Sequence, residues 1–368
     1  MRPHFRLLED TLIGRILDEA RDILQHMGVK VQNPTALALL AEVGAEVDTA
    51  SQQVRMGAAV IDRALASTPR GFSLHDQAGQ AVCDFSGHKV HFTPGSAAIN
   101  LLDEPSGELR RPSCRDYVRY AKVVDGLPHL ASQSTCMVPS DVPERAGDSI
   151  RLFLSLLHGR KPVVTGCFTA EAFEVMRDLQ VIVRGSAQAL ADKPLCVFSC
   201  CPTSPLKWSD VTSQNVIDCA RAGIPVEFIA MPLTGFMAPV TLVGTLVAHT
   251  AETLSGVVLA QAARAGTPIL YGGSPAAFDI RYETTPMGAV ETQMIDCATS
   301  EIGKFLGLPT QAYIGLSDAK ALDAQAGLES SMGMTLAALS GINSVSGPGM
   351  LDFESCQSLE KLVVDDEI

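Results

Sequence analysis

Residues 225–273 read PVEFIAMPLTGFMAPVTLVGTLVAHTAETLSGVVLAQAARAGTPILYGG, and a βαβ unit can be inferred from them. The short apolar run PVEFIAM comes first, a long apolar stretch from Val240 to Gly266 follows, and a second short run, TPILYGG, ends the segment. A short apolar run bounded by turn residues is typical of a buried strand, and a long one is typical of a helix. The order therefore predicts two parallel strands joined by a crossover helix.

The same alternation covers the chain from residue 89 onward, and each helical pattern ends near a Gly or Pro. The strand candidates are KVHFTPGSAAINLL, PHLASQST, KPVVTGCF, PLCVFSCC, PVEFIAM, TPILYGG, PTQAYIGL and INSVSGPGML. Eight such βα units most simply close into an α/β fold of the (β/α)8 TIM-barrel type. A doubly wound open sheet is the alternative, but no strand-to-helix turn carries G-x-G-x-x-G.

The first part of the chain has a different pattern. Residues 1–88 are expected to form a mainly helical N-terminal region, with helices over 7–27, 33–42 and 60–66 and a short β meander at its end. The barrel is then expected over 89–368. The last residues, SLEKLVVDDEI, resemble the beginning of a helix, so the sequence predicts a barrel truncated at its C-terminal helix.

Composition narrows the function classes. The 368 residues include 28 Lys+Arg and 41 Asp+Glu, a net charge of −13, without a basic cluster, which argues against nucleic acid and anionic membrane as partners. The apolar stretch over 240–266 carries His249, Glu252 and Arg264, so it predicts a buried helix rather than a membrane span. The N-terminus lacks the apolar core of a signal peptide, and we expect a cytoplasmic protein. No C-x-x-C or His/Cys pair indicates zinc.

In a TIM barrel the reaction site lies at the carboxyl ends of the strands, in the loops that follow them. This rule selects a set of mainly polar and aromatic residues. They are Ser96, Asn100, Ser134, Thr135, Thr165, Thr203, Ser204, Glu227, Thr234, Tyr271, Asp279, Tyr313, Ser317, Asp318, Lys320, Asp323 and Gln325, with Gly347, Pro348 and Gly349 after the last strand.

Each of the more informative positions has two interpretations. Glu227 interrupts an apolar strand, so its carboxylate needs either a cationic ligand or a structural Arg or Lys partner. Tyr271 precedes Gly272 and Gly273, which indicate either a close approach of ligand to backbone or only a tight turn. The Ser317–Gln325 segment gathers polar groups, although Asp323 is equally explained as a helix N-cap.

Other residues favour structural roles. Asp279 and Arg281 are expected to form an ion pair that shapes a loop, and His249 is expected to be a satisfied core residue of a helix. No Ser-His-Asp or Cys-His arrangement is evident, so the pattern argues against hydrolysis by an activated nucleophile.

Three long blocks, residues 95–130, 235–281 and 313–368, together with the helical lead-in, are similar to the trimethylamine methyltransferase family. The resemblance covers nearly the whole chain. It implies a (β/α)8 barrel that moves a methyl group from a methylated amine to the cobalt of a separate corrinoid protein. The sequence shows no in-frame pyrrolysine, so it resembles the branch without that residue, which includes glycine betaine:corrinoid methyltransferases.

The resemblance implies a reaction in which Co(I) of the corrinoid takes a methyl group from a quaternary amine. Aromatic faces and carboxylates would hold the cation, and the substrate-binding candidates are Glu227, Tyr271, Tyr313, Asp318, Lys320 and Gln325. A betaine carboxylate would need Lys320, Arg281 or backbone N–H groups. Loops expected to face the corrinoid contain Gly95, Ser96, Ser204, Gly272, Gly347 and Gly349.

No D-x-H-x-x-G motif is present, so the corrinoid is expected on a small partner protein, with no zinc. The expected partners are that protein and a small quaternary amine, and a homo-oligomer is compatible with the pattern. Two alternatives stay open. One is a non-catalytic barrel that binds quaternary amines, and the other is a lyase that uses Lys320 as a Schiff-base nucleophile.

Overall fold

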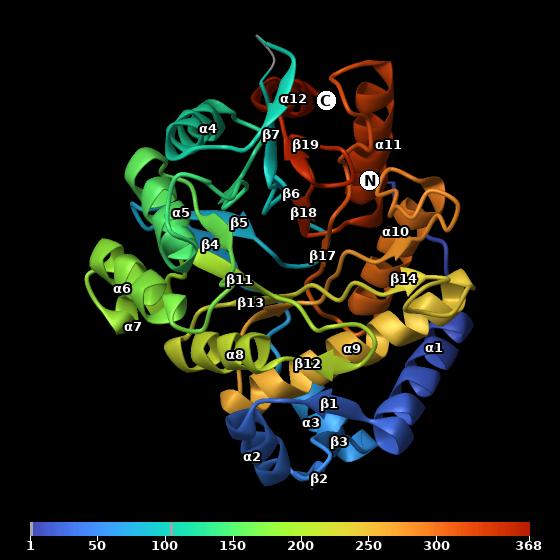
Figure 1. Ribbon diagram of the computed structural model, residues 1–368. Helices are drawn as coiled ribbons and strands as arrows, with labels where there is room; N and C mark the ends of the chain where they lie inside the picture. Colours follow the sequence, from blue (N-terminus) through green and yellow to red (C-terminus); the bar gives the residue numbers. More distant parts are fainter. Residues whose placement is uncertain (1–2, 104–105) are drawn as a thin grey trace.

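The computed structural model describes residues 3–103 and 106–368, and eight parallel strands form a closed ring in it (Figure 1). The strands are β6 (His91–Thr93), β9 (Gln133–Ser134), β10 (Val163–Thr165), β11 (Cys196–Cys200), β13 (Val226–Phe228), β15 (Ile269–Leu270), β17 (Gln311–Ala312) and β18 (Ser344–Ser346).

Backbone pairing shows that the ring is closed. Ladders join β9, β10, β11, β13 and β15 in that order, and β17, β18 and β6 form a second run. A parallel bridge between Tyr271 and Thr310 joins the two runs on one side. On the other side Phe92 bridges Leu130, and the Ala131 N–H donates to the Phe92 carbonyl at 2.9 Å. The predicted (β/α)8 barrel is confirmed, with all eight expected strands.

A helix follows each strand and covers the outside of the ring (Figure 1). These helices are α4 (Cys114–Gly126), α5 (Glu144–His158), α6 (Ala172–Arg184) with α7 (Ala187–Asp192), α8 (Asp210–Ala222), α9 (Leu242–Ala263), α10 (Val290–Phe305), α11 (Ala324–Ser340) and α12 (Leu359–Glu367). Local sequence sets several of their ends. Side chains such as those of Ser113, Ser209, Asp323 and Ser358 cap first turns, and Gly223 ends α8 at a φ of 74°.

Short strands beyond the carboxyl ends of the barrel strands build the rim of that end. One sheet contains β7 (Asn100–Asp103), β8 (Glu108–Arg110), β19 (Met350–Leu351) and β20 (Cys356–Gln357). A second pairs β14 (Leu233–Thr234) with β16 (Ala276–Ala277). The opposite end is closed by the antiparallel hairpin β4 (Ser73–His75) and β5 (Ala81–Asp84), whose apolar side chains cluster with inward-facing residues of β10, β11 and β15.

The segment before β6 packs on the barrel. It contains α1 (Asp10–Asp22), a π-helical turn (Ile23–Met27), β1 (Val29–Val31), α2 (Pro34–Glu42), β2 (Glu46–Asp48), β3 (Gln53–Arg55) and α3 (Ala58–Ser67). The three expected helices are confirmed. The small sheet of β1, β2 and β3 is not indicated by the sequence pattern, and β1 extends it to β12 (Lys207–Trp208) of the barrel. The expected meander is a hairpin only, because its third strand, β6, joins the barrel.

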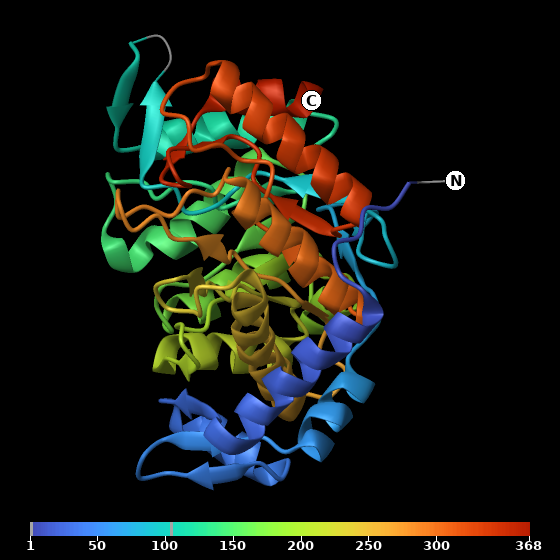
Figure 2. The same cartoon turned by 90° about the vertical axis from the view of Figure 1, so that its right-hand side faces the viewer.

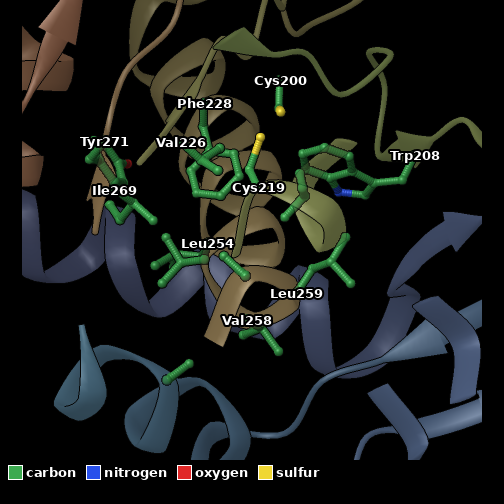
Figure 3. Packing of buried hydrophobic residues seen from close by; sticks show 14 of the residues in the cluster. Cys200, Trp208, Cys219, Val226, Phe228, Leu254, Val258, Leu259, Ile269 and Tyr271 are labelled. Atoms are coloured by element: carbon green, nitrogen blue, oxygen red, sulfur yellow. The ribbon is translucent and has the colours of Figure 1, made fainter. Parts of the chain in front are cut away.

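Helix α9 lies between the barrel wall and α1, α2 and α3 (Figures 1 and 2). It is the one helix of the described residues that is long and apolar enough to span a membrane, and 72% of that stretch is buried inside the protein. Figure 3 shows Phe228 and Tyr271 of the wall on the side of α9 that carries Leu254. The prediction of a buried core helix is therefore confirmed.

Candidate active site

A cavity of about 550 Å³ opens among the carboxyl ends of the barrel strands. Its lining residues come from the ends of the barrel strands, from the loops after them and from the helices α5 and α8. They are Ser96, Ala97, Thr135, Arg151, Thr165, Gly166, Cys167, Phe168, Ser199, Cys201, Ser209, Val211, Thr212, Ile229, Met231, Ser274, Tyr313 and Glu354. Of the residues selected from the sequence, Ser96, Thr135, Thr165 and Tyr313 line this cavity. The cavity is therefore at the end where barrels of this type carry their chemistry.

Glu227 is fully buried beside the cavity. Val226 and Phe228 face outward onto the helix layer, so the alternation of a strand turns Glu227 toward the barrel interior (Figure 3). Its Oε1 accepts a hydrogen bond from Ser199 Oγ at 2.6 Å, and its Oε2 has no hydrogen-bond partner among the described residues. Burial raises the pKa of Glu227 to about 7, although the Ser199 hydroxyl opposes that shift. Of the two interpretations of this residue, a structural Arg or Lys partner is not seen in the described part of the chain.

A second carboxyl group, that of Glu354, enters the cavity from the segment after β18. Asp352, Phe353 and Glu354 have consecutive positive φ angles of 51°, 56° and 68°. Such a conformation costs about 1–3 kcal/mol for each non-glycine residue and persists where surrounding contacts impose it. Lys320 supplies two of those contacts, an ion pair with Asp352 and a position 5.1 Å from the centroid of the Phe353 ring. Burial raises the pKa of Glu354 to about 8.

Two further groups lie within electrostatic range of Glu354. The Tyr313 hydroxyl is 2.8 Å from Ser96 Oγ, and burial, followed by the charges of Glu354 and Glu227, raises the pKa of Tyr313 well above its usual value. Asp296 on α10 is fully buried, and neither carboxylate oxygen has a hydrogen-bond partner among the described residues. Burial, and then the charge of Glu354, raises the pKa of Asp296 well above its usual value. We call Glu227, Asp296 and Glu354 the acidic cluster.

Arg151 is the one cationic side chain among the cavity-lining residues listed above, and it is 2% exposed. Its Nη2 donates to Asp148 Oδ1 at 2.6 Å, and its Nη1 donates to the Thr135 carbonyl at 3.0 Å. The guanidinium carbon lies 4.8 Å from the centroid of the Phe168 ring, within range for a cation–π contact. The ring of Phe168 is itself largely exposed. Arg151 therefore places an oriented guanidinium, which is ion-paired with Asp148, at the cavity wall.

Tyr271 does not line the cavity. Its ring faces the helix layer (Figure 3). There its hydroxyl donates to Thr250 Oγ1 at 3.1 Å, and its ring packs edge-on against His249. His249 is fully buried, as expected of a core residue, and its Nε2 donates to the Gly272 carbonyl at 3.0 Å. Its Nδ1 has no hydrogen-bond partner among the described residues, so the ring is satisfied at one nitrogen and not at both. The strand alternation that turns Glu227 inward turns Tyr271 outward, and the sequence rule does not separate the two faces.

The other charged candidates are also placed outside the cavity lining. Asp318 accepts the N–H groups of Met287 and Gly288, each at 2.8 Å, and burial raises its pKa to about 6. Lys320 is 73% exposed and paired as described above, and Gln325 is exposed with its amide bonded to Glu329. Arg281 is 79% exposed and forms the expected ion pair with Asp279.

The glycines expected to face the corrinoid are buried in the strand ends instead. A Cβ on Gly95 would lie 2.1 Å from Met350 Cγ, and one on Gly347 would lie 2.2 Å from the Ile314 carbonyl oxygen. Gly272 and Gly349 are similarly enclosed by glutamine side chains, Gln311 and Gln357. These glycines allow close packing of neighbouring segments. Ser204 bonds to Glu252 at 2.8 Å, and Ser96 is the member of this set that lines the cavity.

The remaining polar candidates make contacts within the protein. Asp323 caps α11, as one interpretation of the sequence has it, and Ser317 Oγ donates to Glu329 at 2.6 Å. Thr234 Oγ1 lies 2.8 Å from Thr245 Oγ1, and Ser134 Oγ donates to the Gly95 carbonyl at 2.7 Å. Asn100 lies in β7, Thr203 bridges Lys207, and Pro348 lies in the turn that leads to β19.

Several site residues are missed by reasoning from strand ends alone. Ser199 lies inside a strand, and Arg151 and Asp296 lie on helices, where one sequence shows no signal that a polar residue faces the barrel. Glu354 follows the last strand by several residues, and extending the same rule past Gly349 would have found it. Within residues 3–103 and 106–368, no group of three or more His, Cys, Asp or Glu is arranged to hold a metal ion.

Comparison with known proteins gives consistent results. The profile of the family described as Trimethylamine methyltransferase (MTTB) matches residues 1–368. The trimethylamine methyltransferase MttB of Methanosarcina barkeri is 33% identical over 359 residues, which cover 94% of this chain and 71% of that protein. The glycine betaine methyltransferase of Desulfitobacterium hafniense is 28% identical over 368 residues, which cover 100% of this chain and 76% of that protein.

A solved structure supports the fold. The monomethylamine methyltransferase MtmB of Methanosarcina barkeri superposes with a TM-score of 0.63 at 12% identity, covering 99% of this chain and 74% of that one. At this identity the match concerns architecture alone. The profile match, the sequence relatives and the barrel agree, and the chain belongs to the trimethylamine methyltransferase family, a family of methyltransferases.

Proposed function

We propose that the protein transfers a methyl group from a quaternary amine, of the glycine betaine type, to the Co(I) corrinoid of a small partner protein. The single observation that carries the proposal is the acidic cluster, Glu227, Asp296 and Glu354, which has no cationic partner among the described residues. Uncompensated buried carboxyl groups are costly, and a cationic ligand compensates them.

The chemistry needs little more than placement and charge. In the transfer the carbon–nitrogen bond of R–N(CH₃)₃⁺ breaks, its electron pair stays on nitrogen, and the methyl group bonds to cobalt, whose Co(I) state supplies the other electron pair. The product amine leaves neutral without a proton, so no general acid is required. The carboxyl groups hold the cation and orient one methyl group toward the mouth of the barrel, which is a contribution of proximity and electrostatics.

The methyl acceptor approaches the cavity from the open end of the barrel. Around this end the side chains of Phe168, Met231 and Phe236 are exposed, and Phe236 stacks on Phe278 with ring centroids 4.7 Å apart. Among the sequence candidates, Glu227 and Tyr313 keep a direct role toward the cation, and Ser96 orients the Tyr313 hydroxyl. Asp318, Lys320 and Gln325 act through the loops they hold.

The test is turnover with a defined acceptor. The purified chain is mixed with a reduced corrinoid protein and a panel of quaternary and tertiary amines, and methylation of the corrinoid is followed by absorption while NMR identifies the demethylated amine. We expect turnover with at least one quaternary amine. Glu354→Gln should lower it strongly, whereas Glu42→Gln, a change at an exposed site, should not. Absence of turnover with every amine would refute the proposal.

A non-catalytic amine-binding barrel is the second candidate function, because the same acidic cluster would serve it. Tight amine binding without methyl transfer, in the presence of a competent corrinoid partner, would support that function. A Schiff-base lyase has less support, because Lys320 is exposed, paired with Asp352 and outside the described lining of the cavity.

A further inference from the structure

A basic and an acidic group lie on opposite sides of the cavity, the Arg151 guanidinium, which is paired with Asp148, on one side and the Glu354 carboxyl group on the other. Around the ring the strand order is β6, β9, β10, β11, β13, β15, β17, β18, so β10 and β17 face each other across the barrel. Arg151 and Phe168 belong to the segments after β9 and β10, whereas Tyr313 and Glu354 follow β17 and β18. Among the described residues Arg151 forms its ion pair with Asp148 and none with Glu227, Asp296 or Glu354, so the guanidinium and the acidic cluster are not partners of each other.

Arg151 keeps hydrogen-bonding capacity toward a ligand. A guanidinium has five N–H groups, and Arg151 donates one from Nη2 to Asp148 and one from Nη1 to Thr135. Its Nε–H is buried and has no hydrogen-bond partner among the described residues. The other Asp148 oxygen accepts the Phe168 N–H at 2.7 Å, so both carboxylate oxygens are hydrogen-bonded and the ion pair fixes the guanidinium in place. A buried, oriented guanidinium with unused donors is suited to a carboxylate.

The beginning of α8 lies on the same side of the cavity as Arg151. Ser209, Val211 and Thr212 of its first turn line the cavity, and the positive end of the helix dipole is directed there. The acidic residue of that turn, Asp210, bonds to Asn33 at 2.8 Å and is absent from the lining. Backbone and side chain thus favour a negative group at this wall.

We propose that Arg151, held by Asp148 against Phe168, is the residue that recognises the carboxylate of the substrate and so determines its specificity. The inference rests on the proposed function, in which the acidic cluster holds the quaternary nitrogen. It replaces the expectation that Lys320 or Arg281 binds the carboxylate, because both are exposed and paired outside the cavity lining. A cation that lacks a carboxylate leaves the Arg151 donors unmet and binds more weakly.

The test compares two ligands that share a trimethylammonium group. Glycine betaine carries a carboxylate and choline carries a hydroxyl. Calorimetry on the intact protein should show glycine betaine bound more tightly than choline. Arg151→Gln should weaken the binding of glycine betaine by about tenfold to a hundredfold and change the affinity for choline by no more than about twofold. Arg151→Lys keeps the charge but not the planar arrangement of donors, so its affinity for glycine betaine should lie between that of the parent and that of Arg151→Gln. Arg160→Gln, at an exposed arginine, is the matched control.

Each outcome either supports or overturns the proposed role of Arg151. Equal loss of both ligands in Arg151→Gln, with native circular dichroism, would show a structural role and overturn the inference. If Arg151→Gln does not fold, Arg151→Lys must still weaken glycine betaine selectively, and loss of both ligands there has the same meaning. Choline bound as tightly as glycine betaine, with methyl transfer intact, refutes the specificity role alone. No binding of either ligand and no transfer refutes the proposed function as well.

Discussion

Ser199 and Glu227 are register partners on the neighbouring strands β11 and β13, and the Ser199 hydroxyl donates to Glu227 Oε1 at 2.6 Å. Because both face the barrel interior, the serine is positioned to stabilise the ionised carboxylate in a place where burial disfavours it. The pKa of Glu227, about 7, is the outcome of these two opposed effects. Small changes near this pair should therefore change the charge of the site at neutral pH.

Ser199→Ala removes the donor, and we expect the pKa of Glu227 to rise further. Amine affinity at pH 7 should fall, and the pH midpoint of binding should move upward. The measurement is a titration of affinity against pH. Ser346→Ala is the matched control, since Ser346 is a buried barrel-strand serine whose hydroxyl has no hydrogen-bond partner among the described residues. An unchanged midpoint in Ser199→Ala would contradict the assignment.

Glu227→Gln should remove one pH-dependent contribution to the free energy of unfolding. Glu227 has a pKa of about 7 when folded and about 4.5 as its ordinary value, so between these pH values the folded state keeps a proton that the unfolded state has lost. Its contribution to stability is present below pH 4.5 and is lost as pH rises through 7. The free energy of unfolding of the variant, relative to the parent, should therefore increase from pH 5 to pH 8.

Comparison with the parent protein is necessary because Lys304 gives the opposite slope. Burial lowers the pKa of Lys304 to about 7, so its contribution increases as pH rises through that value. This slope is common to both proteins and cancels in the difference. Urea unfolding at several pH values provides the measurement, with Glu42→Gln as an exposed control. A constant difference across the range would be inconsistent with a buried carboxyl of raised pKa.

Binding of a quaternary amine should release protons near neutral pH. Glu354 in the cavity and Glu227 beside it have carboxyl pKa values of about 8 and about 7, and a bound cation favours their ionised forms. Affinity should therefore increase from pH 6 to pH 8.5. Calorimetry in two buffers of different ionisation enthalpy measures the proton count directly. The release should shrink in Glu354→Gln, and a proton uptake on binding would contradict this account.

The sequence alone predicted the barrel with its eight strands, because strand and helix patterns alternate regularly and each strand is buried. It also predicted that Glu227 needs a partner, since a carboxylate inside an apolar strand has few explanations. The pattern could not assign Tyr271, which lies on an outward-facing strand position, and it could not find Arg151 or Asp296. Those two lie on helices, and their role depends on which helix face meets the barrel, which only tertiary packing determines.

Asp365→Asn should destabilise the fold by about 3–5 kcal/mol, because it leaves the buried Lys361 ammonium without its counter-charge. The side chains of this pair are each 1% exposed and joined at 2.5 Å, and Asp365 also accepts the Gly349 N–H at 2.6 Å. The double change Lys361→Met with Asp365→Leu should cost less than the single one, since it removes both charges. Urea unfolding of the parent, the single variant and the double variant gives the comparison, and a double variant less stable than the single one would contradict it.

Gly256→Ala should be destabilising although alanine is the better helix former. Gly256 lies inside α9, and a Cβ there would come within 2.7 Å of the Phe228 ring and 2.8 Å of Trp208 Cζ2, the two aromatic side chains that Figure 3 shows over this helix. Helix α9 and the two rings are already in direct contact at this point. An added methyl group therefore has to displace the rings, which lowers the free energy of unfolding by about 1–3 kcal/mol. The higher helix propensity of alanine offsets about 0.5–1 kcal/mol of that loss.

Gly14→Ala is the matched control for that change. Gly14 lies inside α1, and nothing is within 4 Å of the position its Cβ would occupy. The higher helix propensity of alanine therefore acts at this position without a steric clash, and the variant should be more stable than the parent by about 0.5–1 kcal/mol. Thermal and urea unfolding of the two variants should thus shift in opposite directions. A gain in both would mean that α9 stands further from Phe228 and Trp208 than the structure places it, since only the close contact makes the two glycines different.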